Sequence, residues 1–154
     1  MNLILGAVLL LATAFPSNGK TAWMRLESFR LAIGMPRNDA LRELKTWQPK
    51  KGSTPNEIVV DYDGERALTV TFKNDRVQSV RFELYTLLPE TRKAFEEQRA
   101  YLRETRGEPR KTLPSVLIYD NVLPNVMVVV NDDPNSEQGK KGVGVLAVRF
   151  YDPR

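Results

Sequence analysis

The sequence predicts an α+β fold in which two tandem helix-plus-three-strand units form an antiparallel sheet with the helices on one face. Residues 40–82 and 101–150 carry similar motifs in the same order, and each copy ends in a Val-Arg-Phe triplet. In each copy, apolar residues first recur at helical spacing and then alternate as they do in strands. One such unit buries its apolar face poorly alone, so the second copy is expected to complete the core.

The first unit is expected to open with a strand and a helix. Apolar residues alternate over residues 29–33, which predicts a short strand. The helix that follows begins at Pro36 or Asn38 and ends before Pro49, because proline is favoured in a first helical turn and breaks a helix interior. Its apolar face is expected to contain Ala40, Leu41, Leu44 and Trp47.

The second helix is expected between Pro89 and Gly107, since proline can open a helix and glycine commonly ends one. Phe95 and Leu102 lie on its buried side. Next to this buried side, four arginines lie within about 60° of one another around the helix axis and form a basic edge. Glutamates one helical turn away can pair with these arginines, so we interpret the edge as an ordinary solvated helix face. The alternative is that the edge binds an acidic partner. The basic edge consists of Arg92, Arg99, Arg103 and Arg106.

Six strands are expected in two series of three, because apolar and polar residues alternate in each segment. In the first series, Asp-Gly at 63–64 and Asn-Asp at 74–75 are the tight turns, since these residues tolerate positive φ. The two units therefore span about residues 29–85 and 86–151. The expected strands are 58–62, 68–73, 77–84, 116–119, 125–131 and 143–151.

The amino-terminal segment predicts export. Residues 1–19 contain no charged side chain, and residues 3–15 are all apolar or small. This run is too short for an ordinary membrane span, and small residues suit cleavage by a signal peptidase after Ala14 or Gly19. We expect a signal peptide over 1–19 and a single domain over 20–154 in the periplasm or outside the cell, without stable membrane insertion after cleavage. An uncleaved anchor is the alternative.

The amino-acid composition excludes several classes of function. All 42 charged residues lie after residue 19, and the formal net charge of +4 forms no concentrated basic stripe, so nucleic acid is not an expected partner. The chain has no cysteine and no histidine, hence no disulfide, no thiol nucleophile and no histidine base or metal ligand. No nucleophile or phosphate-loop motif is present, and no carboxylate spacing requires an acid–base pair. We therefore predict no enzymatic activity and no cofactor.

Several short motifs resemble a known superfamily. An Ile-Gly-Met step into a short amphipathic helix, a Leu-Thr-Val-Thr-Phe strand and the run Asn-Asp-Arg-Val-Gln-Ser-Val resemble the small outer-membrane assembly lipoproteins. The duplication, with Arg-Gly-Glu-Pro after the second helix, resembles the β-lactamase inhibitor protein arrangement. The resemblance covers about residues 29–151 and implies an exported protein that binds other proteins through a sheet face and hairpin loops. The lipidated cysteine and the inhibitor's disulfides are missing, so neither family's specific role is carried over.

The two units differ on the outward face of their strands. One strand points Thr69 and Thr71 outward, whereas its counterpart points Met127 and Val129 outward, because side chains alternate across a sheet. Apolar residues on both faces of a strand normally mean that both faces are covered. The cover is the lead-in at residues 23–29, an external partner or a second copy, unless the register differs from the expected one. The expected partner-binding residues are Met127, Val129, Val145, Ala147, Tyr151, Asp132 and Asp133.

The loop at residues 131–142 is seven residues longer than its counterpart. Its start is rich in oxygen ligands, including Asp132 and Asp133, but it lacks the spacing and the glycine of a calcium loop, and two lysines follow. It is therefore expected to be a flexible hairpin loop without a metal. Long loops on rigid sheets often make contacts, which is why its aspartates are candidate binding residues.

These observations together predict an exported protein-binding module without catalytic activity, which binds another protein through its sheet face and hairpin loops. The alternative is a structural or scaffolding component of the cell envelope that self-associates through the same apolar face. Size-exclusion chromatography separates the two, because a self-associating chain runs as a dimer at micromolar concentration and a binder of another protein runs as a monomer.

Overall fold

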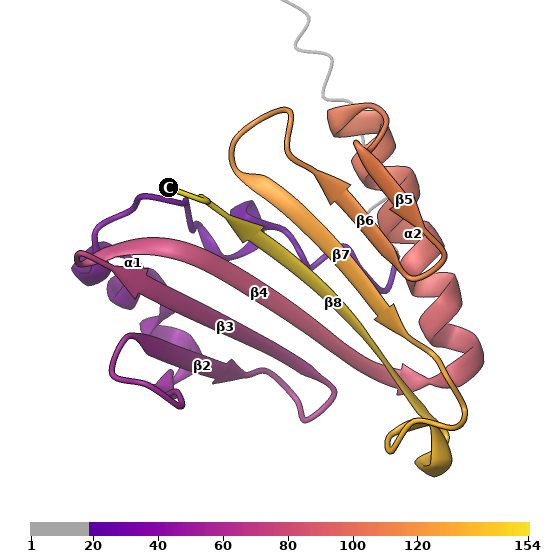
Figure 1. The fold of residues 1–154 in the computed structure, drawn as a ribbon. Helices are drawn as coiled ribbons and strands as arrows, with labels where there is room; N and C mark the ends of the chain where they lie inside the picture. Colours follow the sequence, from indigo (N-terminus) through magenta and orange to yellow (C-terminus); the bar gives the residue numbers. More distant parts are fainter. Residues whose placement is uncertain (1–18) are drawn as a thin grey trace, which may run out of the picture.

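The computed structural model describes residues 19–154, so residues 1–18 of the predicted export signal lie outside the described part of the chain. Eight antiparallel strands form one sheet in the order β1-β2-β3-β4-β8-β7-β6-β5 (Figure 1). The strands are β1 (Lys50–Lys51), β2 (Glu57–Asp61), β3 (Arg66–Lys73), β4 (Arg76–Leu87), β5 (Lys111–Leu113), β6 (Val116–Tyr119), β7 (Asn125–Asn131) and β8 (Val143–Tyr151).

The prediction of two tandem helix-plus-three-strand units is wrong, although the α+β class holds. All eight strands belong to one continuous sheet, and the edge strands β1 and β5 lie outside the six that alternation predicts. At the centre, β4 and β8 pair without interruption from Ser79 opposite Tyr151 to Leu87 opposite Val143. The strands therefore form one eight-stranded sheet, not two helix-plus-three-strand units.

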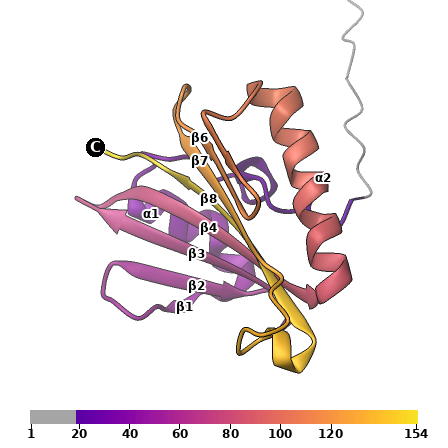
Figure 2. The same cartoon turned by 45° about the vertical axis from the view of Figure 1, so that its right-hand side comes forward.

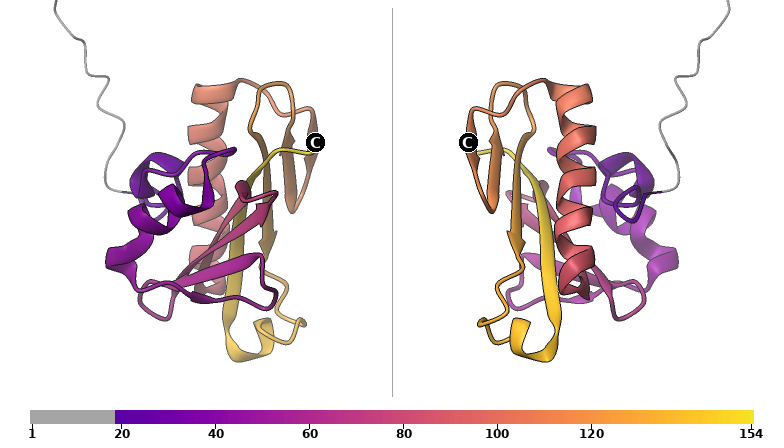
Figure 3. Two further views of the ribbon diagram at one scale, coloured as in Figure 1. Left: turned by 90° about the vertical axis from the view of Figure 1, so that its left-hand side faces the viewer. Right: turned by 90° about the vertical axis from the view of Figure 1, so that its right-hand side faces the viewer.

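The helices lie on one face of this sheet, as the side views in Figure 3 show. The face of the sheet that the helices contact is called the covered face, and the opposite face is called the open face. Within residues 19–154, no helix is long and apolar enough to cross a membrane. The helical segments are α1 (Arg37–Leu44), α2 (Leu88–Arg106) and the 3-10 turns η1 (Leu26–Phe29), η2 (Lys45–Trp47) and η3 (Gly139–Lys141).

Strand alternation sends one set of side chains from every central strand into the core beneath the helices. On β3, Leu68, Val70 and Phe72 are buried, whereas Thr69 and Thr71 on the open face are only partly buried. β4, β7 and β8 repeat this pattern. Their buried apolar residues are Val77, Val80, Phe82, Leu84, Val126, Val128, Val130, Leu146, Val148 and Phe150.

The helices close the core with the residues that their periodicity predicts, with two exceptions. On α2, Phe95 and Leu102 are buried as predicted, and Gln98 joins them. On α1, Leu44 is fully buried, but Leu41 is only half-buried, and Trp47, which lies in η2, is 36% exposed. Leu41 is therefore not a core residue, although the sequence predicts it on the apolar face of this helix.

The lead-in packs on the covered face. The short strand predicted over 29–33 is absent, because η1 ends at Phe29 and Arg30, with φ of 53°, reverses the chain at the point where the strand was expected to begin. Met24 is fully buried, and the Trp23 ring lies 5.6 Å from that of Phe82 in an edge-on contact. Figure 2 shows this segment, in indigo, among the helices behind the sheet. The lead-in therefore does not cover the open face.

A glycine allows α2 to approach the sheet closely. Gly144 on β8 lies under the first turn of α2, where an added Cβ would stand 2.4 Å from the Thr91 hydroxyl oxygen. That hydroxyl donates to the Leu87 carbonyl oxygen at 3.0 Å, which holds the threonine in place. The absence of a side chain at Gly144 thus sets the distance between helix and sheet.

Candidate binding site on the open sheet face

A groove of about 880 Å³ runs across the open face. Its lining comes from β2, β3, β4, β8 and β7, with Ser53 and Thr54 from the turn before β2. Figure 1 views the molecule from this side and shows the helices behind the sheet. Among residues 19–154, no helix covers the groove, so its side chains face solvent.

One side of the groove is apolar. Val129 on β7 lies directly opposite Ala147 on β8, and Met127 lies one step along the same face. All three are partly exposed and line the groove. Val145 and Tyr151 share the same face of β8 but lie toward its ends, outside the groove lining. The structure therefore brings three of the five predicted strand residues together in one patch, Met127, Val129 and Ala147, here called the apolar patch.

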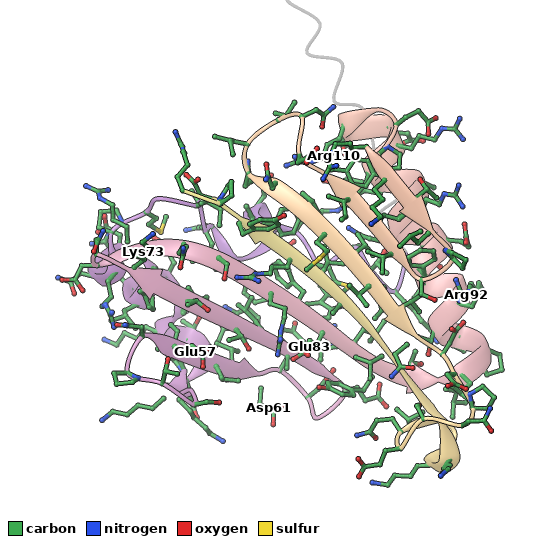
Figure 4. The ribbon with its side chains drawn as sticks, viewed as in Figure 1. Glu57, Asp61, Lys73, Glu83, Arg92 and Arg110 are labelled. Carbon is green, nitrogen blue, oxygen red and sulfur yellow. The ribbon has the colours of Figure 1, made fainter. Side chains whose placement is uncertain are left out.

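The other side of the groove is polar. Thr69 and Thr71 of β3 line it together with Glu83 of β4 and Glu57 of β2. Figure 4 labels the two glutamates, which lie over β2 to β4 on the side facing the viewer. Burial raises the pKa of the nearby Tyr85 hydroxyl, and the negative charge of Glu83 raises it further, so this phenol is a neutral hydrogen-bonding group at pH 7.

Two arginines meet at the centre of the groove. Arg81 on β4 is directly opposite Arg149 on β8, an arrangement of like charges that destabilises a sheet. Arg81 is relieved by Glu83, whose carboxylate oxygen lies 3.2 Å from Nη2. In the described part of the chain, no carboxylate forms an ion pair with Arg149. Its Nη2 donates to the Ser79 hydroxyl at 3.4 Å, and its guanidinium lies 5.3 Å from the centre of the Tyr151 ring.

The loop after β7 is fixed to α2, not to the groove. Arg92 Nε and Nη2 donate to the two carboxylate oxygens of Asp132 at 2.6 and 2.8 Å, and Arg92 Nη1 donates to the Pro114 carbonyl at 2.7 Å. Asp133 accepts a hydrogen bond from the Asn135 amide at 2.8 Å, which forms a local turn. Figure 4 places Arg92 at the α2 side of the molecule. Both predicted loop aspartates thus hold the loop, and neither lines the groove.

The rest of the basic edge is engaged within the chain. Arg99 lies 3.7 Å from a carboxylate oxygen of Glu96, and Arg103 lies 2.6 Å from one of Glu108. Arg106 donates to two carbonyl oxygens of the β6–β7 turn at 3.0 and 2.7 Å, and burial lowers the pKa of its guanidinium. These contacts match those of a solvated helix edge with structural hydrogen bonds.

Sequence reasoning missed Arg81, Arg149 and Glu83 as site residues. The available signal is the repeated Val-Arg-Phe triplet, whose flanking apolar residues face the core and therefore point both arginines outward. No group of three or more acidic side chains in the described range is arranged to hold a metal ion.

Comparison of the chain with known proteins gives no information about its function. No protein-family model matches the chain, and no curated protein or solved structure matches it. The function is therefore inferred from the geometry and chemistry of the open face.

Proposed function

We propose that the chain is an exported protein-binding module that takes its partner into the groove on the open face. The observation that carries this proposal is the apolar patch, which is partly exposed on strands whose other side is fully buried. Removing apolar surface from water contributes about 25 cal/mol per Å², so covering Met127 and Val129 favours association.

The groove is built on strands that are each paired on both sides, which favours binding. Its central strands β4 and β8 pair with each other over their common length, and each also pairs with a second neighbour. A partner that docks on this surface does not have to order it first, so little conformational entropy is lost on the groove side. The resemblance to proteins that bind through a sheet face supports the same function.

Self-association through the open face is the weaker alternative. If two copies paired about the centre of the groove, Arg81 and Arg149 of one copy would face the same residues of the other. Like charges brought together in an interface oppose binding. A different protein carries no such constraint, and we therefore favour a heterotypic partner.

Export rests on the uncharged residues 1–19. Mass spectrometry of the protein recovered from the periplasm or the medium should give a new amino terminus at Phe15 or Lys20. A full-length product retained in the membrane would contradict export.

The binding proposal is tested by replacing Met127 and Val129 together with Thr, the residue that β3 carries on its open face. The immobilised wild-type protein should capture a partner from an extract of the source cells, and the double variant should not. The matched control replaces Leu113 and Val122, two exposed apolar residues outside the groove, with Thr. This control should capture the partner normally. Equal capture by both variants would remove the groove from consideration.

Size-exclusion chromatography of the same proteins addresses self-association. The wild type should run as a monomer at micromolar concentration. A dimer that the Met127 and Val129 replacements convert to a monomer would instead favour the scaffolding function.

A further inference from the structure

The centre of the groove contains a cation, Arg149, that no carboxylate of the described residues neutralises. Among residues 19–154, no carboxylate oxygen lies within ion-pairing distance of Arg149, whose polar contact is the hydroxyl of Ser79. Its cross-strand neighbour Arg81 adds a second positive charge, and Glu83 compensates only one of the two. A guanidinium carries five N–H donors in a planar fork, so most of the capacity of Arg149 is available to a ligand.

The apolar patch is adjacent to this cation. Met127 is directly opposite Arg149 in the β7–β8 pairing, so their Cβ atoms are about 5 Å apart. The chain thus presents a partly buried positive charge and an apolar surface side by side. Within a partly buried groove, a charge pair is screened less by salt than it is on an open surface.

We propose that the groove recognises an acidic segment of another protein, in which one carboxylate pairs with Arg149 and a neighbouring apolar side chain packs on Met127 and Val129. This rests on the proposed function and names the chemistry of its partner. A planar guanidinium and a carboxylate form two parallel hydrogen bonds, which give direction as well as affinity.

The dimensions and charges of the groove select a segment of protein. The groove crosses five strands, so its width is about 19 Å, which is far larger than a small anion. Glu57 and Glu83 on its polar side repel a second run of negative charge. The preferred ligand therefore has one or two acidic residues flanked by apolar ones, not a long acidic tract.

The test is selection of displayed random peptides of about twelve residues on the purified protein, a length suited to an extended segment in a groove. Enriched peptides should contain Asp or Glu next to an apolar residue. Changing that acid to its amide in the peptide, or Arg149→Gln in the protein, should each weaken binding about tenfold or more, and higher salt should weaken it further. Arg149→Lys, which keeps the charge but loses the planar fork, should retain part of the affinity. Arg99→Gln on α2 is the matched control and should bind normally.

Three outcomes distinguish this inference from the proposed function. If acidic peptides are enriched and their binding requires Arg149 as well as the apolar patch, the result supports the carboxylate anchor and the proposed function. Peptides without acidic residues that are lost when Met127 and Val129 become Thr overturn the carboxylate anchor but leave the groove as the binding site. Peptides that bind all groove variants equally, or no enrichment at all, overturn both. Because the acid-to-amide change is made in the peptide, the anchor can be tested even if Arg149→Gln folds poorly.

Discussion

The two faces of the sheet are built from the same strands with opposite chemistry. On the covered face, β3 presents Leu68, Val70 and Phe72 to the helices, and these side chains are almost fully buried. On the open face, the same strand presents Thr69 and Thr71, and they line a groove. The core of the fold is thus supplied by the covered face. The open face is free to carry residues, such as two arginines directly opposite each other, that stability alone does not favour.

The largest expected difference in stability is between substitutions at two adjacent residues of β4, one on each face. Phe82→Ala should lower the free energy of unfolding by about 3 to 5 kcal/mol, because the ring is fully buried and packs against several aromatic residues. Arg81→Ala on the open face should cost about 1 kcal/mol or less. Urea denaturation of both variants measures the difference, and comparable losses would mean that the two faces are not distinct.

Gly144→Ala tests the spacing between α2 and the sheet. A Cβ at this position would meet the Thr91 side chain at less than 3 Å, so we expect a loss of about 1 to 3 kcal/mol from overpacking. Combining it with Thr91→Ala should recover part of that loss, which a double-mutant cycle detects. A neutral Gly144→Ala would mean that α2 shifts to make room, and that Gly144 does not set the distance between helix and sheet.

The double replacement of Met127 and Val129 by Thr should change stability little. Both residues are partly exposed on the open face, and Thr is itself favoured in strands, so the expected cost is about 1 kcal/mol or less for each. Thermal unfolding monitored by circular dichroism is the measurement. A loss as large as that of Phe82→Ala would show that the apolar patch is part of the core.

The smallest effect concerns an ion pair that belongs to neither face. The Arg154 guanidinium holds the pKa of the Asp152 carboxyl down to about 2, below its ordinary value of 3.8. A carboxyl whose pKa is lowered by folding contributes stability that is present above about pH 4 and lost as pH falls through about 2. Asp152→Asn should therefore be slightly less stable than the wild type at pH 6, and the difference should shrink as pH falls below about 4 and disappear below about 2. A difference that grows on acidification would contradict this assignment.

Alternation in sequence predicted the second half of the sheet well. The bounds of β6, β7 and β8 agree with the expected strands, because apolar residues alternate up to clear turn signals on either side. The turn at Asn74 and Asp75 also has the positive φ that its residues favour. By contrast, β1 and β5 have no alternation to detect, since they are short edge strands made mainly of exposed residues.

The parts of the site that depend on pairing between distant strands could not be predicted from the sequence. Parity alone was sufficient to place Met127, Val129 and Ala147 on one face. The meeting of Arg81 and Arg149 depends on the β4–β8 register, which joins residues 68 positions apart and has no local signal. The pairing of Arg92 with Asp132 likewise depends on where α2 lies over the sheet, so two separately predicted groups meet in a structural ion pair.

The most direct test of the central claim is the reactivity of single cysteines, because the chain has none of its own. Ala147→Cys places a thiol on the open face, and Val148→Cys places one on the covered face of the same strand. A water-soluble thiol reagent should modify Ala147→Cys rapidly in the free protein and slowly in the complex with its captured partner, whereas Val148→Cys should react slowly in both. Slow modification of Ala147→Cys in the free protein, or a rate that the partner leaves unchanged, would contradict binding through the open face.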